Sequence, residues 1–343
     1  MNKECSIMNP SNKSDDREEY LMTNVSTQAG ARPETPRHSR WRMIKANFQR
    51  YWGLYLLLLP TLIYAAIFLY GPMYGLLIAF KDYNSKLGVT GSPWATPFYK
   101  YLQRFFTSYN CGKLISNTLT ISLYTLAASF PIPILFALML NQLPNGKFKK
   151  LVQTVSYAPH FISTVVLVSM LSVFLAPSSG IVNILITKLG GQAFYFMGSE
   201  SAFKHVYVWS GIWQSMGWSS IIYVAALAGV SPDQHEAAIV DGANKIQRIW
   251  YVDIPAIMPT AVTMLILNTG NIMSIGFEKA FLMQNNLNTG ASEIISTYVY
   301  KVGILNGQFS YSTAIGMFNA VICCVMVLLV NWISRKTTES GLW

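Results

Sequence analysis

Several long runs of this chain contain no Asp, Glu, Lys or Arg, and these runs limit what it can fold into. A soluble domain usually carries about 25% charged residues, whereas 12% of these 343 residues are charged and 52% are hydrophobic. Water does not favour so many uncharged apolar faces, but a bilayer does. The sequence therefore predicts an integral membrane protein.

The uncharged runs are long enough for membrane-spanning helices, because roughly 20 apolar residues cross the hydrocarbon core. Six runs qualify, and we expect an all-α fold of six transmembrane helices. In chain order the expected spans are 52–70, 114–140, 151–176, 206–230, 255–277 and 311–333.

Half of the net charge of +10 lies just before the first run. Six basic residues and the single acid Glu34 lie between Arg32 and Arg50. Lys and Arg collect on the cytoplasmic side of membrane proteins and meet anionic lipid there, so we expect a lipid contact and no nucleic acid. Residues 1–50 are expected to form a disordered basic cytoplasmic tail without a cleavable signal. Six spans then place both termini in the cytoplasm.

The most informative segment, residues 231–259, lies between the fourth and fifth expected spans. Ser231 followed by Pro232 is a strong helix start, because serine caps a helix and proline suits its first position. Gln234 can complete a capping box with the serine. Gly242 should end this helix, since glycine tolerates the left-handed conformation of a helix stop.

A second helix is expected after Gly242. Four apolar side chains at i, i+3, i+4 and i+8 form one stripe, which we expect to pack inward: Ile246, Ile249, Trp250 and Ile254. Two short helices joined by a glycine turn could fill a groove in a partner protein. An ordinary interfacial helix that anchors the fifth span explains the pattern about equally well.

Three short motifs in this segment resemble the EAA loop of binding-protein-dependent ABC importer permeases: Glu236-Ala237-Ala238, Asp241-Gly242-Ala243 and Ile254-Pro255. The family usually has Leu before that proline, so Ile254 is a mild departure. The resemblance implies a type I ABC importer transmembrane domain over roughly residues 113–332. It also implies that the loop forms the coupling helices that dock on separate nucleotide-binding subunits.

Further segments resemble the carbohydrate, or oligosaccharide, permeases of this family: 59–60, 70–75, 79–83, 156–161, 307–314 and 341–343. This likeness implies an importer of a sugar or oligosaccharide in a bacterial plasma membrane. The implied partners are a second, homologous permease subunit, two ATP-binding cassette subunits and an extracellular sugar-binding lipoprotein.

The chain has no phosphate-binding loop of the G-x-x-x-x-G-K-[ST] type, since its Gly-Lys pairs, Gly112-Lys113 and Gly146-Lys147, precede Leu114 and Phe148. ATP and Mg are therefore expected on the partner subunits. No catalytic, cofactor-binding or metal-binding pattern is present. We expect a transport subunit, not an enzyme.

A sugar pathway needs amides, hydroxyls and flat aromatic faces. Six such residues within or beside the spans are candidates for it: Trp213, Gln214, Asn268, Asn271, Tyr157 and His160. Asn117 belongs to the wider set of polar residues in the spans. Each could instead bond a neighbouring helix or mark the membrane interface.

An ATP-independent secondary transporter or channel is the alternative function. It predicts coupling carboxylates within the spans, and the expected spans contain none. The expected organisation is a tail (1–50), a first span with an outer loop (51–112), a permease core (113–332) with its coupling loop (231–259), and a cytoplasmic C-terminus (333–343).

Overall fold

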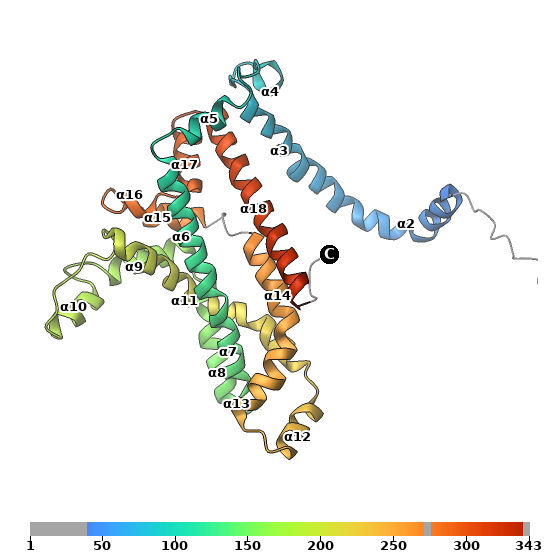
Figure 1. Ribbon diagram of the computed structural model, residues 1–343, viewed down its shortest axis with the longest axis vertical. Coiled ribbons are helices and arrows are strands. Elements are labelled where there is room, and N and C mark those ends of the chain that lie inside the picture. Colours follow the sequence, from blue (N-terminus) through green and yellow to red (C-terminus); the bar gives the residue numbers. More distant parts are fainter. Residues whose placement is uncertain (1–39, 271–275, 339–343) are drawn as a thin grey trace, which may run out of the picture. The chain divides into compact units, whose positions relative to one another are not determined.

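Helices form nearly all of the regular structure in the described part of the chain. The computed structural model describes residues 40–270 and 276–338 (Figure 1). Within these ranges an isolated antiparallel bridge joins Lys81 and Trp94. The chain divides into two compact units, with Gly71 closing the first and Pro72 opening the second.

The N-terminal unit is a long helix followed by a π turn. α2 covers Arg40–Tyr64, and the π turn η1 covers Ala65–Tyr70. α2 thus begins upstream of residue 50, where the sequence placed the end of a disordered tail. Arg, Met, Lys and Ala, which occupy much of this early stretch, are good helix formers.

The C-terminal unit contains many helices of unequal length. Its first half contains α3 (Gly71–Met73, at the boundary), the 3₁₀ helix η2 (Tyr74–Phe80), α4 (Gly88–Gly91), α5 (Lys100–Phe106), α6 (Cys111–Ser129), α7 (Pro131–Asn141), α8 (Lys147–Tyr157), the 3₁₀ helix η3 (Ala158–Phe161), α9 (Thr164–Phe174) and α10 (Ile181–Lys188). Its second half contains α11 (Glu200–Ala228), α12 (Pro232–Val240), α13 (Lys245–Arg248), the π turn η4 (Ile249–Asp253), α14 (Ile254–Gly270), α15 (Phe277–Met283), α16 (Thr289–Ser292), α17 (Ile295–Tyr300), the π turn η5 (Lys301–Leu305) and α18 (Phe309–Thr338).

Four helical stretches in the described ranges are long and apolar enough to cross a bilayer: Phe48–Phe80, Cys111–Asn141, Lys245–Gly270 and Phe309–Lys336. They correspond to the first, second, fifth and sixth spans expected from the sequence. A fifth is added if Lys147–Phe161 and Thr164–Phe174 are counted as one broken span.

The expected third span is not a straight helix, because its two parts are bent by 99°. Pro159 lies just before the bend, and Ile162 is extended with ψ 127°. Ser163 then starts α9 as its N-cap, its Oγ accepting a hydrogen bond from the Val166 N–H at 3.4 Å. A new cap within an apolar run starts a second helix in a new direction, which the hydrophobic pattern does not reveal.

The expected fourth span corresponds to α11, which has 29 residues. α11 is not among the helices that are apolar enough to count as candidate membrane spans. A helix of that length measures about 43 Å, so length is not the obstacle. Buried serines, Ser210 and Ser220, lower its apolar character. α11 packs against α6, α7, α8 and α14, so these polar groups lie inside the protein and do not face lipid.

α11 comes close to the backbone of α8 at Gly217. A Cβ atom there would lie 2.1 Å from the Ser156 carbonyl oxygen of α8. A side chain at this position would force backbone apart, since that oxygen cannot rotate away. Small residues of this kind are how helices pack closely in membranes.

Three buried clusters hold the C-terminal unit together. The first joins α6, α9, α11 and α15, and the second joins α5, α6, α17 and α18. The third, here called the α7–α11–α14 cluster, consists of Ala137, Leu138, Tyr223, Leu227, Ile257 and Ala261. α6 and α11 each contribute to two of the three, and α11 also packs against α7, α8, α14 and α16.

Hydrogen bonds and an ion pair join the loop after η2 to α5 and α18. Lys81, which is buried, donates to the Val89 carbonyl at 2.7 Å, and its own carbonyl accepts from the Ser310 hydroxyl at 2.6 Å. Asp82 accepts from the Tyr101 hydroxyl at 2.6 Å and pairs with Lys100 at 2.9 Å. The Tyr101 bond, and then Lys100, lower the pKa of Asp82 below its usual value.

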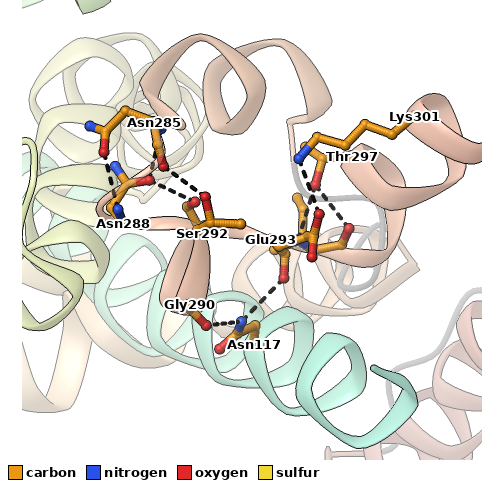
Figure 2. Close-up of polar contacts among 10 residues, drawn as sticks. Asn117, Asn285, Asn288, Gly290, Ser292, Glu293, Thr297 and Lys301 are labelled. Carbon is orange, nitrogen blue, oxygen red and sulfur yellow. Dashed lines mark hydrogen bonds and ion pairs between the residues drawn. The ribbon is translucent and has the colours of Figure 1, made fainter. Parts of the chain in front are cut away.

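The segment between α15 and α17 is held by side chains that reach across the fold (Figure 2). Asn117 on α6 donates to the carbonyls of Gly290 and Glu293, at 2.9 and 3.2 Å. Glu293 also pairs with Lys301 at 3.1 Å. Asn117 is buried and bonds backbone, so in the structure it joins two segments and is not among the residues that line the cavity described below.

Asn288 is the fully buried centre of the same segment. Its amide donates to the carbonyls of Met197 and Met283, at 2.8 and 2.9 Å. Its Oδ1 accepts from the Ser292 hydroxyl at 2.8 Å and from the Asn285 N–H at 2.9 Å. One amide side chain thereby bonds polar groups from four positions.

We predict that Asn288→Ala destabilises this unit by about 1–3 kcal/mol for each buried group left without a partner. The expected result is a lower apparent melting temperature of the purified protein in detergent. Asn306→Ala, at an exposed position, is the control and should melt like the wild type. Equal melting of the two variants would contradict the role given to Asn288.

Candidate functional site

α12 and α13 lie together at one end of the C-terminal unit, the lower end in Figure 1. α12 begins as the sequence predicts, with Ser231 as N-cap and Pro232 at the first position. The predicted capping box with Gln234 does not form. Ser231 Oγ accepts from the Asp233 N–H at 3.3 Å, while the Gln234 N–H donates to the Ser231 carbonyl at 3.1 Å.

The capping box occurs instead at the start of α13. Asn244 Oδ1 accepts from the Gln247 N–H at 2.9 Å, and Gln247 Oε1 accepts from the Asn244 N–H at 2.8 Å. This reciprocal pair fixes the direction in which the chain returns toward α14.

The predicted helix stop at Gly242 is confirmed. Gly242 has φ +80°, in the left-handed region. The Ala243 N–H donates to the Ala238 carbonyl at 2.9 Å, and the Gly242 N–H donates to the Ile239 carbonyl at 3.0 Å. These two bonds are those of a Schellman motif, which needs a residue able to adopt positive φ.

The surface of α12 is largely open. Glu236, Ala237, Asp241 and Gly242 are exposed, and α12 has no buried residue. Ala238 and Ala243 are half-buried. Next to them Ile239 is 55% and Val240 87% exposed. An apolar tip that remains uncovered in the single chain is typical of a surface that another protein covers.

The predicted apolar stripe after Gly242 is wrong in part. Ile249 and Ile254 pack inward against the α7–α11–α14 cluster. Ile246 and Trp250 point outward, at 67% and 63% exposure. The cause is the π turn η4, Ile249–Asp253, because in a π turn residues i and i+5 lie one above the other. Pro255 follows, exposed, in the first turn of α14.

A cavity of about 320 Å³ lies among residues of α6, α7, α11 and α14. Its described lining carries no charged side chain. Seven hydroxyls and one amide contribute to it: Ser122, Thr125, Ser129, Tyr207, Ser215, Ser219, Tyr223 and Asn268. Such a surface offers many hydrogen bonds, which suits a hydroxyl-rich solute.

Of the predicted pathway residues, Asn268 lines this cavity. Trp213 faces a separate apolar groove with Leu167 and Phe174. Gln214 donates to the Ile162 carbonyl at 2.7 Å and so fastens the break before α9.

The remaining predicted pathway residues lie elsewhere. Tyr157 ends α8, and the His160 ring stacks on Trp218 with their centroids 4.5 Å apart. Asn271 lies outside the described residues.

The hydroxyls that line the cavity were missed, although the sequence carries a signal for them. Ser122, Thr125 and Ser129 are spaced i, i+3 and i+7, on one face of the second span. Three more in α11 are spaced i, i+4 and i+8: Ser215, Ser219 and Tyr223. A search for helical periodicity among hydroxyls within apolar runs would have found both rows.

Comparison with known proteins gives one family match. Residues 129–339 match the family described as "Binding-protein-dependent transport system inner membrane component". The chain is 42% identical over 301 residues to the polygalacturonan/rhamnogalacturonan transport system permease protein YteP of Bacillus subtilis (strain 168), covering 88% of this chain and 92% of that protein.

A second relative and a solved structure extend the match. The arabinooligosaccharides transport system permease protein AraP of the same organism is 27% identical over 225 residues, covering 65% of this chain and 70% of that protein. The crystal structure of a bacterial alginate ABC transporter, in complex with an alginate pentasaccharide-bound periplasmic protein, contains a chain similar to this one. That chain is 38% identical with a TM-score of 0.80, and the match covers 87% of this chain and 99% of that one.

We predict that water reaches the cavity. In a background with Cys5, Cys111, Cys323 and Cys324 replaced by serine or alanine, Ser219→Cys should react with a charged, membrane-impermeant methanethiosulfonate, measured by mass. Only the thiolate reacts, and a thiolate forms readily where water is present. Ile257→Cys, at a position 1% exposed, is the matched control and should stay unlabelled. An unreactive Ser219→Cys would contradict a wet cavity.

Proposed function

The chain belongs to the family of binding-protein-dependent transport system inner membrane components, and from that membership we propose that it forms one half of the membrane pathway of an ATP-driven oligosaccharide importer. The chain is the transport component of such a system. ATP and Mg are assigned to two partner ATP-binding cassette subunits. A second, homologous permease subunit and an extracellular sugar-binding lipoprotein complete the proposed assembly.

The main support for the coupling role is the solvent-exposed surface of α12. Its residues Glu236, Ala237 and Ala238, with Asp241-Gly242-Ala243 after them, are the proposed contact with the ATPase. Ile254-Pro255 close this segment at the return into α14, where Ile254 packs against the α7–α11–α14 cluster and Pro255 is exposed. The exposed Ile239 and Val240 support a partner at this position, because burying two such side chains favours docking by about 2–4 kcal/mol in transfer free energy.

The cavity supports the choice of solute. A saccharide presents hydroxyls that both donate and accept hydrogen bonds, and the lining of serines, tyrosines and one asparagine can do the same. Relatives named for polygalacturonan/rhamnogalacturonan and arabinooligosaccharide transport support an oligosaccharide. The choice among oligosaccharides is assigned to the binding protein.

The proposed topology has six spans with both termini in the cytoplasm of a bacterial cell. It counts the bent pair α8–α9 as one span and α11 as another. On this topology α12 lies on the cytoplasmic side, where ATP is available, and the segment from α15 to α17 lies outside.

The proposed mechanism is alternating access. Docking of the loaded binding protein and closure of the ATPase subunits on ATP favour one state of the helices around the cavity, and ATP hydrolysis favours the other. Each ligand shifts this equilibrium only by its difference in affinity for the two states.

The proposal is tested in proteoliposomes that contain the whole complex. Loaded binding protein should stimulate ATP hydrolysis, and uptake of labelled oligosaccharide should require ATP and resist a protonophore. Uptake that continues without ATP and stops with a protonophore would establish the secondary-transporter alternative.

We predict that Gly242→Val abolishes this stimulation while the protein still inserts into the membrane. A left-handed conformation costs a residue with a Cβ roughly 1–2 kcal/mol, and a β-branched one more. No atom lies within 4 Å of the position a Cβ would take, so the effect comes from backbone conformation alone. Gly242→Asn, which tolerates positive φ, is the control and should keep most of the stimulation. Normal uptake by Gly242→Val would contradict the coupling role.

A further inference from the structure

A buried carboxylate lies where α12, α7 and α14 come together. Asp253 is the last residue of η4, directly before α14, and its side chain is 0% exposed. An ionised carboxylate removed from water needs hydrogen bonds and a cation to remain there. The partners of Asp253 therefore show which elements depend on it.

Two partners come from the end of α7. Asn141 Nδ2 lies 3.4 Å from Asp253 Oδ1, and Gln142 Nε2 donates to Oδ2 at 3.2 Å. Both are neutral amides, so they supply hydrogen bonds without a charge. Arg248, one turn earlier in the chain, adds a positive field at the carboxylate.

The third partner comes from α12. His235 Nε2 lies 3.3 Å from Asp253 Oδ1, and the His235 side chain is 25% exposed. Among the described residues, the His235–Asp253 contact is the one through which a side chain of α12 bonds another helical segment. Because α12 has no buried residue of its own, this pair is a principal tie between α12 and the bundle.

We propose that His235 and Asp253 form a latch through which displacement of α12 is passed to the ends of α7 and α14. The proposal rests on the proposed coupling role of α12 and adds two positioning residues that the EAA motif does not contain. If α12 moved alone, it would leave a buried carboxylate with amide donors but without the imidazole. The helices that carry the carboxylate and its amides therefore follow α12, and both contribute residues to the cavity wall: Pro133 from α7, and Met264 and Asn268 from α14.

The test uses the complete complex in proteoliposomes. His235→Ala should reduce the stimulation of ATP hydrolysis by loaded binding protein, and uptake with it, by about tenfold or more, within the usual range of coupling between sites. The ATPase subunits should still co-purify with the variant. His235→Gln places an amide nitrogen near the position of Nε2 and should restore much of the stimulation.

Asp253→Asn, alone and combined with His235→Ala, completes a double-mutant cycle. For a pair that acts as a unit, the double variant should be no worse than the more defective single variant. Tyr251→Phe, which removes an exposed hydroxyl from the same π turn, is the matched control and should behave like the wild type.

The outcomes separate the latch from the function it rests on. If the wild-type complex shows neither stimulation nor ATP-dependent uptake, the proposed function fails. If the wild type is stimulated and His235→Ala is stimulated equally, the latch alone is wrong. Loss of ATPase co-purification, a glutamine variant as defective as alanine, or additive effects in the cycle would also overturn the latch.

Discussion

A polar group inside a bilayer has no water to bond, so its partner must come from the protein itself. Several hydroxyls in this chain meet that requirement by donating to a carbonyl one turn earlier in their own helix. Ser122 donates to Thr118 at 2.6 Å, and Ser215 donates to Gly211 at 2.8 Å. Both serines also line the cavity. Their protons are bonded within their own helices, and their oxygens keep acceptor capacity for a solute that carries hydroxyl groups.

The same requirement explains how two parts of the C-terminal unit differ. Near α16, Asn288 is enclosed and bonded to backbone carbonyls, which do not move independently of the chain. Near α12, Asp253 is equally buried, but one of its partners is a partly exposed histidine on a helix without buried residues. The first arrangement favours a rigid segment. The second allows α12 to respond to a partner while staying connected to the helices around the cavity.

Local chemistry was sufficient to predict α12 from the sequence. A serine cap, a proline at the first position and a glycine at the stop act within a few residues, so their effect does not depend on distant packing. The capping box was placed at Gln234 because its spacing fits, but the N–H of that residue bonds the Ser231 carbonyl instead. Asn244 and Gln247 have the same spacing relation and do form the box. Where two sites satisfy one pattern, backbone geometry decides between them.

The sequence by itself determined that this chain is helical and apolar enough for a bilayer, that its first, second, fifth and sixth long runs are continuous helical stretches, and where α12 starts and stops. Tertiary structure decided the bend of 99° before α9, the split of the apolar stripe at η4, and the cavity. The reason is physical. Hydrophobic periodicity reports which face of one helix avoids water, but a cavity forms where faces of several helices meet. The rows at Ser122 and Ser215 line a common space because α6 and α11 pack side by side, and nothing local to either helix requires it.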